Sequence, residues 1–130
     1  MTNTASPEDA HIDVDVETQY IEEQSSPDED RYIFSYTITI SNTGKVAAKL
    51  LTRHWMINDA NGNVQEVHGE GVVGEKPYLR PGDSFQYTSG TVIETPVGSM
   101  GGSYQMLTDN GLTFDAEIPV FTLSRPNALH

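Results

Sequence analysis

Cysteine is absent from the sequence, which excludes disulfide bonds, thiol catalysis and cysteine-type zinc sites. Long apolar runs are absent too: the most apolar stretch, 46–51, is interrupted by Lys49 and is far shorter than the roughly 20 residues that span a bilayer. Residues 1–10 contain neither the basic nor the apolar segment of a signal peptide. We therefore expect a cytoplasmic protein that is not inserted in a membrane.

Basic residues are scarce: 7 Lys and Arg stand against 19 Asp and Glu, and the net charge is −12. Most of the excess lies in residues 1–30, which hold ten acids and no Lys or Arg. Such a balance repels phosphate backbones, so we expect no nucleic-acid partner. A chain of 130 residues suits one domain, 1–130, with a disordered tail at 1–10 and a folded part at 11–126.

Helical periodicity is missing as well, whereas apolar residues recur at every second position in many short segments. Turn signals such as Asp59-Ala60-Asn61-Gly62 and Pro81-Gly82 separate these segments. The pattern predicts an all-β fold, an antiparallel immunoglobulin or fibronectin type III-like β-sandwich of about seven or more strands. The predicted strands are 12–21, 32–40, 46–57, 64–68, 84–89, 104–107 and 112–121, with Pro119 marking an edge or a bulge.

Strict alternation along 46–57 assigns Ala48, Leu50 and His54 to one face and Arg53 and Trp55 to the other. The segment 93–102 is rich in glycine and is predicted to be irregular. A single Trp in a sandwich usually belongs to the core, so we expect Trp55 to pack there with aromatic strand residues rather than form a stacking platform. For Arg53 we expect pairing with an acid, the alternative being anion binding.

Several motifs in order and spacing resemble the bacterial ApaG family over about residues 11–126. They are RHWMINDANG (53–62), VHGEGVVGEKP (67–77), LRPG (79–82), FQYTSG (85–90), TPVGSMGGSY (95–104) and IPVF (118–121), preceded by QSSP (24–27). The resemblance implies a fibronectin type III-like fold and a role in Co²⁺ and Mg²⁺ efflux. Related domains occur in larger eukaryotic proteins, including an F-box adaptor, which implies protein binding. The resemblance to the ApaG family carries no set of catalytic residues over to this chain. We therefore expect a non-enzymatic binding protein that acts through a protein partner. A homo-oligomer is compatible with this expectation.

The segment 69–74 matches the pattern G-x-G-x-x-G, which in dinucleotide-binding proteins turns a strand into a helix whose N-terminus faces phosphate. Pro77 and Pro81 leave no room for that helix, so we expect a loop in which glycines permit positive φ. The alternative function is a nucleotide or pyrophosphate binder. Its residues would be Gly69, Gly71 and Gly74 in the loop, with Lys76 and Arg80 as anion donors.

Two strand faces offer metal ligands, although no resident cofactor is expected. Asp13, Asp15 and Glu17 alternate on one strand and present the oxygen ligands that Mg²⁺ takes, but an exposed polar row also serves solubility. Glu66, His68 and Glu70 alternate on another strand, and imidazole nitrogen suits Co²⁺ better. Because one strand cannot surround an ion, His68 would need a ligand from another strand, either His11 or His54.

The glycine-rich segment 96–102 is the predicted partner contact, through Pro96, Gly98 and Met100. Loops at the end of a sandwich carry function on a rigid scaffold, and an exposed Met adapts to apolar partners. The alternative is that Met100 folds back into the core.

Overall fold

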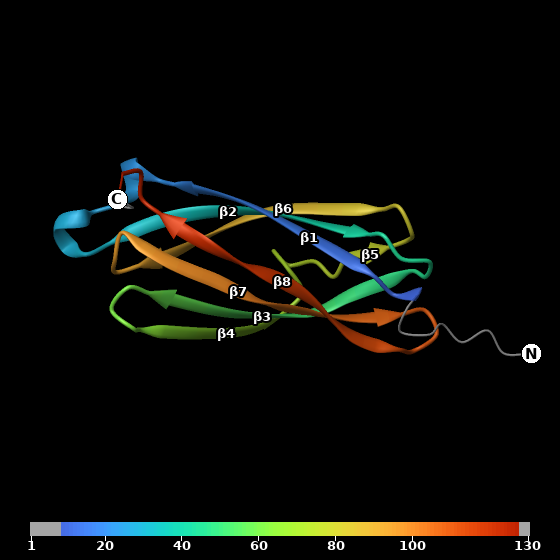
Figure 1. Cartoon of the computed structure of the whole chain (residues 1–130). Coiled ribbons are helices and arrows are strands. Elements are labelled where there is room, and N and C mark those ends of the chain that lie inside the picture. The colour runs from blue at the N-terminus through green and yellow to red at the C-terminus, as the bar shows by residue number, and fades with distance from the viewer. Residues whose placement is uncertain (1–8, 128–130) are drawn as a thin grey trace, which may run out of the picture.

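The computed structural model describes residues 9–127, so residues 1–8 of the predicted tail at 1–10 lie outside the described residues. Strands dominate the described chain, and only two short 3₁₀ helices, η2 and η3, interrupt them (Figure 1). The strands are β1 (Ile12–Tyr20), β2 (Tyr32–Asn42), β3 (Ala48–Asp59), β4 (Val64–Glu70), β5 (Tyr78–Leu79), β6 (Ser84–Ile93), β7 (Val97–Thr108) and β8 (Thr113–Ser124), and the 3₁₀ helices are η2 (Glu22–Gln24) and η3 (Pro27–Glu29).

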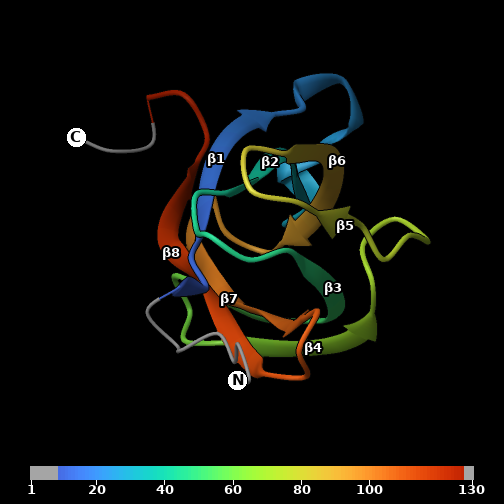
Figure 2. The same ribbon diagram turned by 90° about the vertical axis from the view of Figure 1, so that its right-hand side faces the viewer.

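The strands form two antiparallel sheets that pack face to face, which confirms the predicted sandwich. The first sheet has the order β1-β2-β6, and the second has the order β4-β3-β7-β8 with β5 paired to the start of β3. On one side of the sandwich β1 lies against β8, and on the other side β6 and β4 are the outermost strands (Figure 2). Within the described part of the chain, no helix is long and apolar enough to cross a membrane.

The core is built by alternation along β2, in which every second residue from Tyr32 to Asn42 is buried. Phe34, Ile38 and Ile40 are at most 1% exposed and face the second sheet. The second sheet supplies buried side chains in return: Leu50, Trp55, Ile57, Met100, Tyr104, Met106, Ile118 and Leu123. Each such side chain contributes roughly 1.5–3 kcal/mol through burial, so this interface is the main source of stability.

A β-bulge at Leu51 breaks the alternation that the sequence predicted for β3. Leu50 lies opposite Met106 on β7 and Thr52 lies opposite Gln105, so Leu51 is an extra residue without a partner. Inward-facing positions are therefore even before the bulge and odd after it. The predicted faces were wrong for this reason: Leu50 and Trp55 both face the core, 0% and 3% exposed, and His54 faces outward.

The prediction of an irregular segment at 93–102 is correct only for residues 94–96, because β6 runs to Ile93 and β7 begins at Val97. Glycine in this part of β7 permits close contact between backbones rather than a loop. A Cβ at Gly98 would lie 2.5 Å from the carbonyl oxygen of Asn58, and one at Gly102 would lie 1.9 Å from that of His54. Both glycines thus allow β7 to pack tightly against β3.

Met100 is only 1% exposed, so the prediction that it contacts a partner is corrected. It pairs with Ile57 on β3 and Phe121 on β8, and its side chain fills the core between them. Pro96 and Gly98 are half-buried beside it. A flexible Met side chain here fills an irregular core space, which was the alternative that the sequence offered.

The predicted turns and the position of Pro119 are confirmed. Gly62 and Gly82 have φ of +86° and +91°, the left-handed region that both tight turns require, and the amide of Asp83 donates to the carbonyl of Arg80 across the second turn. Pro119 lies on β8, one of the edge strands of the second sheet, where the register to β7 shifts between Met100 and Gly102.

Replacing Gly102 by Ala should destabilise the fold by about 3 kcal/mol, because the new methyl group would collide with the backbone of β3. Gly90→Ala in β6 is the matched control, since a Cβ there would lie 3.3 Å from its nearest neighbour, the carbonyl oxygen of Phe34. Urea unfolding of both variants measures the difference. Equal stability losses would contradict the close approach at Gly102.

Met100→Ala should cost about 2–5 kcal/mol of unfolding free energy, because it removes a buried side chain and leaves a cavity. Val120→Ala serves as the exposed control, since Val120 is 77% exposed and its truncation should change stability by about 0.5 kcal/mol or less. Denaturant midpoints compare the two. A Met100 variant as stable as the Val120 variant would indicate that Met100 is not a core residue.

Candidate functional site

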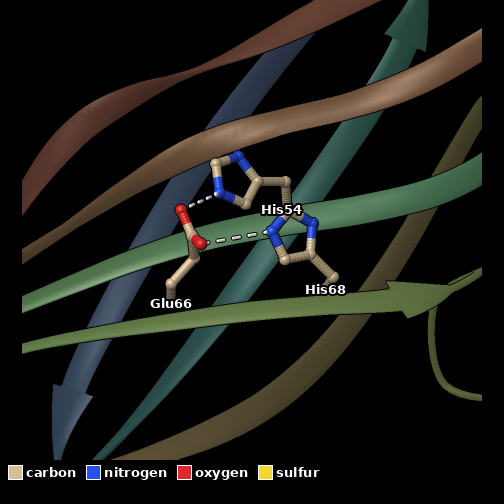
Figure 3. A group of neighbouring side chains, drawn as sticks. All are labelled: His54, Glu66 and His68. Carbon is tan, nitrogen blue, oxygen red and sulfur yellow. Dashed lines mark hydrogen bonds and ion pairs between the residues drawn. The ribbon is translucent and has the colours of Figure 1, made fainter.

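One group of predicted metal ligands is brought together by the pairing of β3 with β4. The register places His54 opposite His68 and Met56 opposite Glu66. Side chains two residues apart on one strand share a face, so Glu66 and His68 project on the same side as His54. Because of the bulge at Leu51, this is the outer face of the second sheet (Figure 3).

The carboxylate of Glu66 lies between the two imidazole rings. Its Oε2 is 3.1 Å from Nε2 of His54, and its Oε1 is 3.4 Å from Nε2 of His68. The two rings stack with centroids 4.3 Å apart and planes 14° apart. One ligand atom from each of the three residues lies within 4.8 Å of the other two. Among residues 9–127, no other three His, Asp or Glu residues bring their ligand atoms together in this way.

Contact with the imidazoles changes the acidity of Glu66. Hydrogen bonds from His54 and then from His68 lower the pKa of its carboxyl group below the ordinary value. The carboxylate is therefore ionised and able to bind a cation over a wider pH range than an isolated Glu. The side chains of Glu66 and His68 are 53% and 68% exposed, so ions reach them directly from solvent.

Two imidazole nitrogens and one carboxylate form a donor set for a transition-metal ion. Ligand atoms held about 2.0–2.2 Å from one ion at tetrahedral or octahedral angles lie roughly 3.0–3.5 Å apart. Each carboxylate oxygen of Glu66 lies in that range from one His nitrogen, whereas single ligand atoms of the three residues lie within 4.8 Å of one another. Rotation of the side chains would therefore be needed to bring all three onto one ion in place of the two hydrogen bonds, and the remaining coordination positions of the ion would stay open.

The other predicted metal ligands are not part of this group. Asp13 and Asp15 lie on β1 in the first sheet, opposite Ser41 and Thr39 of β2, and within residues 9–127 they belong to no group of three possible ligands. His11, one of the two partners that the sequence offered for His68, is 3.8 Å from Asp13 instead. The structure therefore brings His54, one of the two partners that the sequence offered, to Glu66 and His68, while the acidic row on β1 is an exposed strand face.

Glu70 continues the same strand face but is bound elsewhere. Its carboxylate is 2.8 Å from the ammonium group of Lys76, which lowers the pKa of Glu70 through a hydrogen bond and through charge attraction. Arg80, the second predicted anion donor, is 3.5 Å from Asp83. Both cations of the pyrophosphate alternative thus already have carboxylate partners.

The glycine motif at 69–74 forms a tight turn, as the sequence predicted. Gly71 and Gly74 have φ of +62° and +80°, Val73 has φ of +44°, and Val72 pairs with Glu75 across the turn. Gly69 belongs to β4, and no helix follows the motif among the described residues. The geometry that presents helix N–H groups to phosphate is therefore missing from this turn.

Arg53 does not pair with an acid, which corrects the prediction. Its Nη1 donates to the carbonyl oxygens of Glu70 and Gly71, at 3.0 Å each, and no carboxylate of the described residues lies within ion-pair distance. Trp55 is buried and contacts the rings of Tyr36 and Tyr104, which confirms its predicted place in the core.

The pairing of His54 with His68 has a signal in the sequence that strand-by-strand reasoning missed. The predicted hairpin turn at 59–62 is followed by a strand that starts at Val64, which fixes the register of the two arms. A turn centred on Asn61 places Asn58 opposite Val64 and therefore His54 opposite His68. Extending the register along the hairpin selects His54 over His11.

Comparisons of this chain with known protein families, sequences and structures all point to the same family. The ApaG domain (DUF525) matches residues 22–108. Protein ApaG of Nitrosospira multiformis is 61% identical over 119 residues, covering 92% of this chain and 94% of the relative, and Protein ApaG of Azoarcus sp. is 59% identical with the same coverage. A crystal structure of a Bordetella pertussis protein described as ApaA is similar with a TM-score of 0.88 and 44% identity, over 91% of this chain and 96% of that one. With this match over most of its length, the chain belongs to the ApaG family.

Proposed function

We propose that this chain is a non-enzymatic cytoplasmic binding protein that acts in divalent-cation tolerance, in the Co²⁺ and Mg²⁺ efflux that the family resemblance implies. It does so by binding a transition-metal ion at the histidine site, defined as His54, Glu66 and His68, and by contacting a protein partner. The observation that supports this is the convergence of three ligand atoms within 4.8 Å on one face of β3 and β4.

The donor set favours Co²⁺ over Mg²⁺. Imidazole nitrogen binds borderline ions such as Co²⁺, Ni²⁺ and Zn²⁺, whereas Mg²⁺ prefers six oxygen ligands and keeps several waters. The histidine site offers two nitrogens and one carboxylate on a rigid two-stranded surface. The histidine site therefore binds Co²⁺ in preference to Mg²⁺, the other ion of the implied efflux role, and responds to cobalt.

The location of the site suits exchange of the ion with a partner. Three protein ligands leave coordination positions open, and β4 is an edge strand whose residues are largely exposed. A protein partner can thus approach along β4 and supply a further ligand to the same ion. Exposure of His68 permits the ion to be passed on rather than trapped.

Cobalt titration by calorimetry tests metal binding. The wild-type chain should bind one Co²⁺, and Mg²⁺ at the same concentration should give no saturable heat. His68→Gln and His54→Gln should each weaken Co²⁺ binding at least tenfold, because each removes one nitrogen ligand. His11→Gln is the matched control, since His11 contacts Thr43 and Asp13 on the first sheet and should leave the affinity unchanged. Equal affinity in the His68 and His11 variants would exclude the histidine site.

The cellular role can be tested with the same substitutions. Bacteria that lack the chain and are complemented with the double variant His54→Gln, His68→Gln should grow as poorly on toxic cobalt as cells without complementation, because the ion is not captured. Growth at increasing Co²⁺ measures the effect, and immunoblotting confirms equal amounts of protein. Full rescue of growth by the double variant would show that cobalt tolerance does not require the histidine site.

A further inference from the structure

A cavity of about 280 Å³ lies between the two sheets, on the face of β3 opposite the histidine site. Its lining comes from both outermost strands, β4 and β6, and from the core strands between them. The residues that matter are Tyr36, Arg53, Trp55, Gln65, Ser89 and Thr91. The volume lies just below the roughly 300 Å³ at which ligand pockets usually begin, so it suits a small molecule.

The Arg53 guanidinium is held in a fixed position at this cavity. Its Nη1 group donates to two backbone carbonyls, those of Glu70 and Gly71. The plane of the group lies against Gly69, where a Cβ would come within 2.6 Å of Cζ and of both terminal nitrogens. The two backbone hydrogen bonds therefore hold the guanidinium in place, and the absence of a side chain at residue 69 makes room for it.

The remaining donors of Arg53 are not used by the chain. Within residues 9–127, Nε and Nη2 have no hydrogen-bond acceptor, and no carboxylate lies within 4.0 Å of the guanidinium. These two groups carry parallel N–H bonds that match the two oxygens of a carboxylate. A half-buried cation ordinarily has an anionic partner, and here the described chain supplies only carbonyl oxygens.

The surroundings of Arg53 select the rest of the ligand. The rings of Tyr36 and Trp55 form an aromatic wall and lie 5.3 Å apart between centroids. Ser89 and Thr91 on β6 add hydroxyl-bearing side chains to the lining, and Ser89 pairs with Tyr36 of the neighbouring strand. No Lys and no second Arg of the described residues lines the cavity, so a single positive charge suits a monoanion better than a phosphate dianion.

We propose that this cavity binds a small organic carboxylate with an apolar or aromatic body. The carboxylate accepts from Nε and Nη2 of Arg53, and the body packs against Tyr36 and Trp55. This site is separate from the histidine site and does not depend on it, because β3 directs His54 to one face of the sheet and Arg53 to the other. Loss of metal binding would leave carboxylate binding intact.

Tryptophan fluorescence gives a direct test, because Trp55 is the only Trp of the sequence and lines the cavity. Phenylacetate is the probe, and phenylacetamide, which has nearly the same shape without the charge, is its control. A chelator in the buffer keeps metal ions away from the histidine site. The wild-type emission should change saturably with phenylacetate, with an affinity at least tenfold higher than for the amide. Equal affinities, or no saturable change up to millimolar phenylacetate, would overturn the proposal.

Substitutions locate the binding to Arg53. Arg53→Lys keeps the charge but loses the paired donors, so it should weaken phenylacetate binding at least tenfold. Arg80→Lys is the matched control because Arg80 pairs with Asp83 away from the cavity. Circular dichroism checks folding, and if the Arg53 variant does not fold, Thr91→Val at the cavity wall provides the second test, with a severalfold loss expected. Unchanged affinity in a folded Arg53 variant, or tighter binding of inorganic phosphate than of phenylacetate, would contradict the assignment.

Discussion

The bulge at Leu51 is the constraint on which both proposed sites depend. Without an extra residue in β3, Leu50 and Trp55 would face opposite sides of the sheet, since they are an odd number of residues apart. Burying both large side chains requires one residue to leave the pairing with β7. The hydrophobic gain from the core thus requires a bulge between Leu50 and Trp55, and its position at Leu51 directs His54 outward and Arg53 inward.

One hairpin therefore carries two kinds of chemistry on its two faces. On the outer face, Glu66 and His68 of β4 meet His54 in exposed surroundings, where ligands exchange readily. On the inner face, Gln65 and Val67 of β4 line the cavity beside Arg53 and Trp55. The site suited to a cation and the site suited to an anion thus lie on opposite faces of the same sheet.

The sequence predicted the fold class because a half-buried strand must alternate, and β2 alternates over its whole length. Turns were predictable where Gly or Asn accepts positive φ, as at Gly62 and Gly82. Bulges and close backbone contacts were not, because they depend on the partner strand: Leu51 is extra only relative to β7, and Gly102 is required only by the carbonyl of His54. Met100 was misplaced for the same reason, since nothing local distinguishes a strand glycine from a loop glycine. In the candidate site, His68 and its need for a ligand from another strand followed from local spacing, while the choice of His54 followed from the register of the hairpin.

The number of residues in the loop between β3 and β4 determines whether His54 and His68 lie opposite each other. The carboxylate of Asp59 accepts hydrogen bonds from the amides of Asn61 and Asn63 and from the side chain of Asn63, which lower its pKa and fix the turn. If one residue were added or removed between 60 and 63 and the shift passed into β4, Glu66 and His68 would move to the inner face. A shift of two residues would keep the faces but separate His68 from His54. Evolution can therefore vary the composition of this loop more freely than its length, and in related chains the spacing from His54 to His68 should vary less than the residues between them.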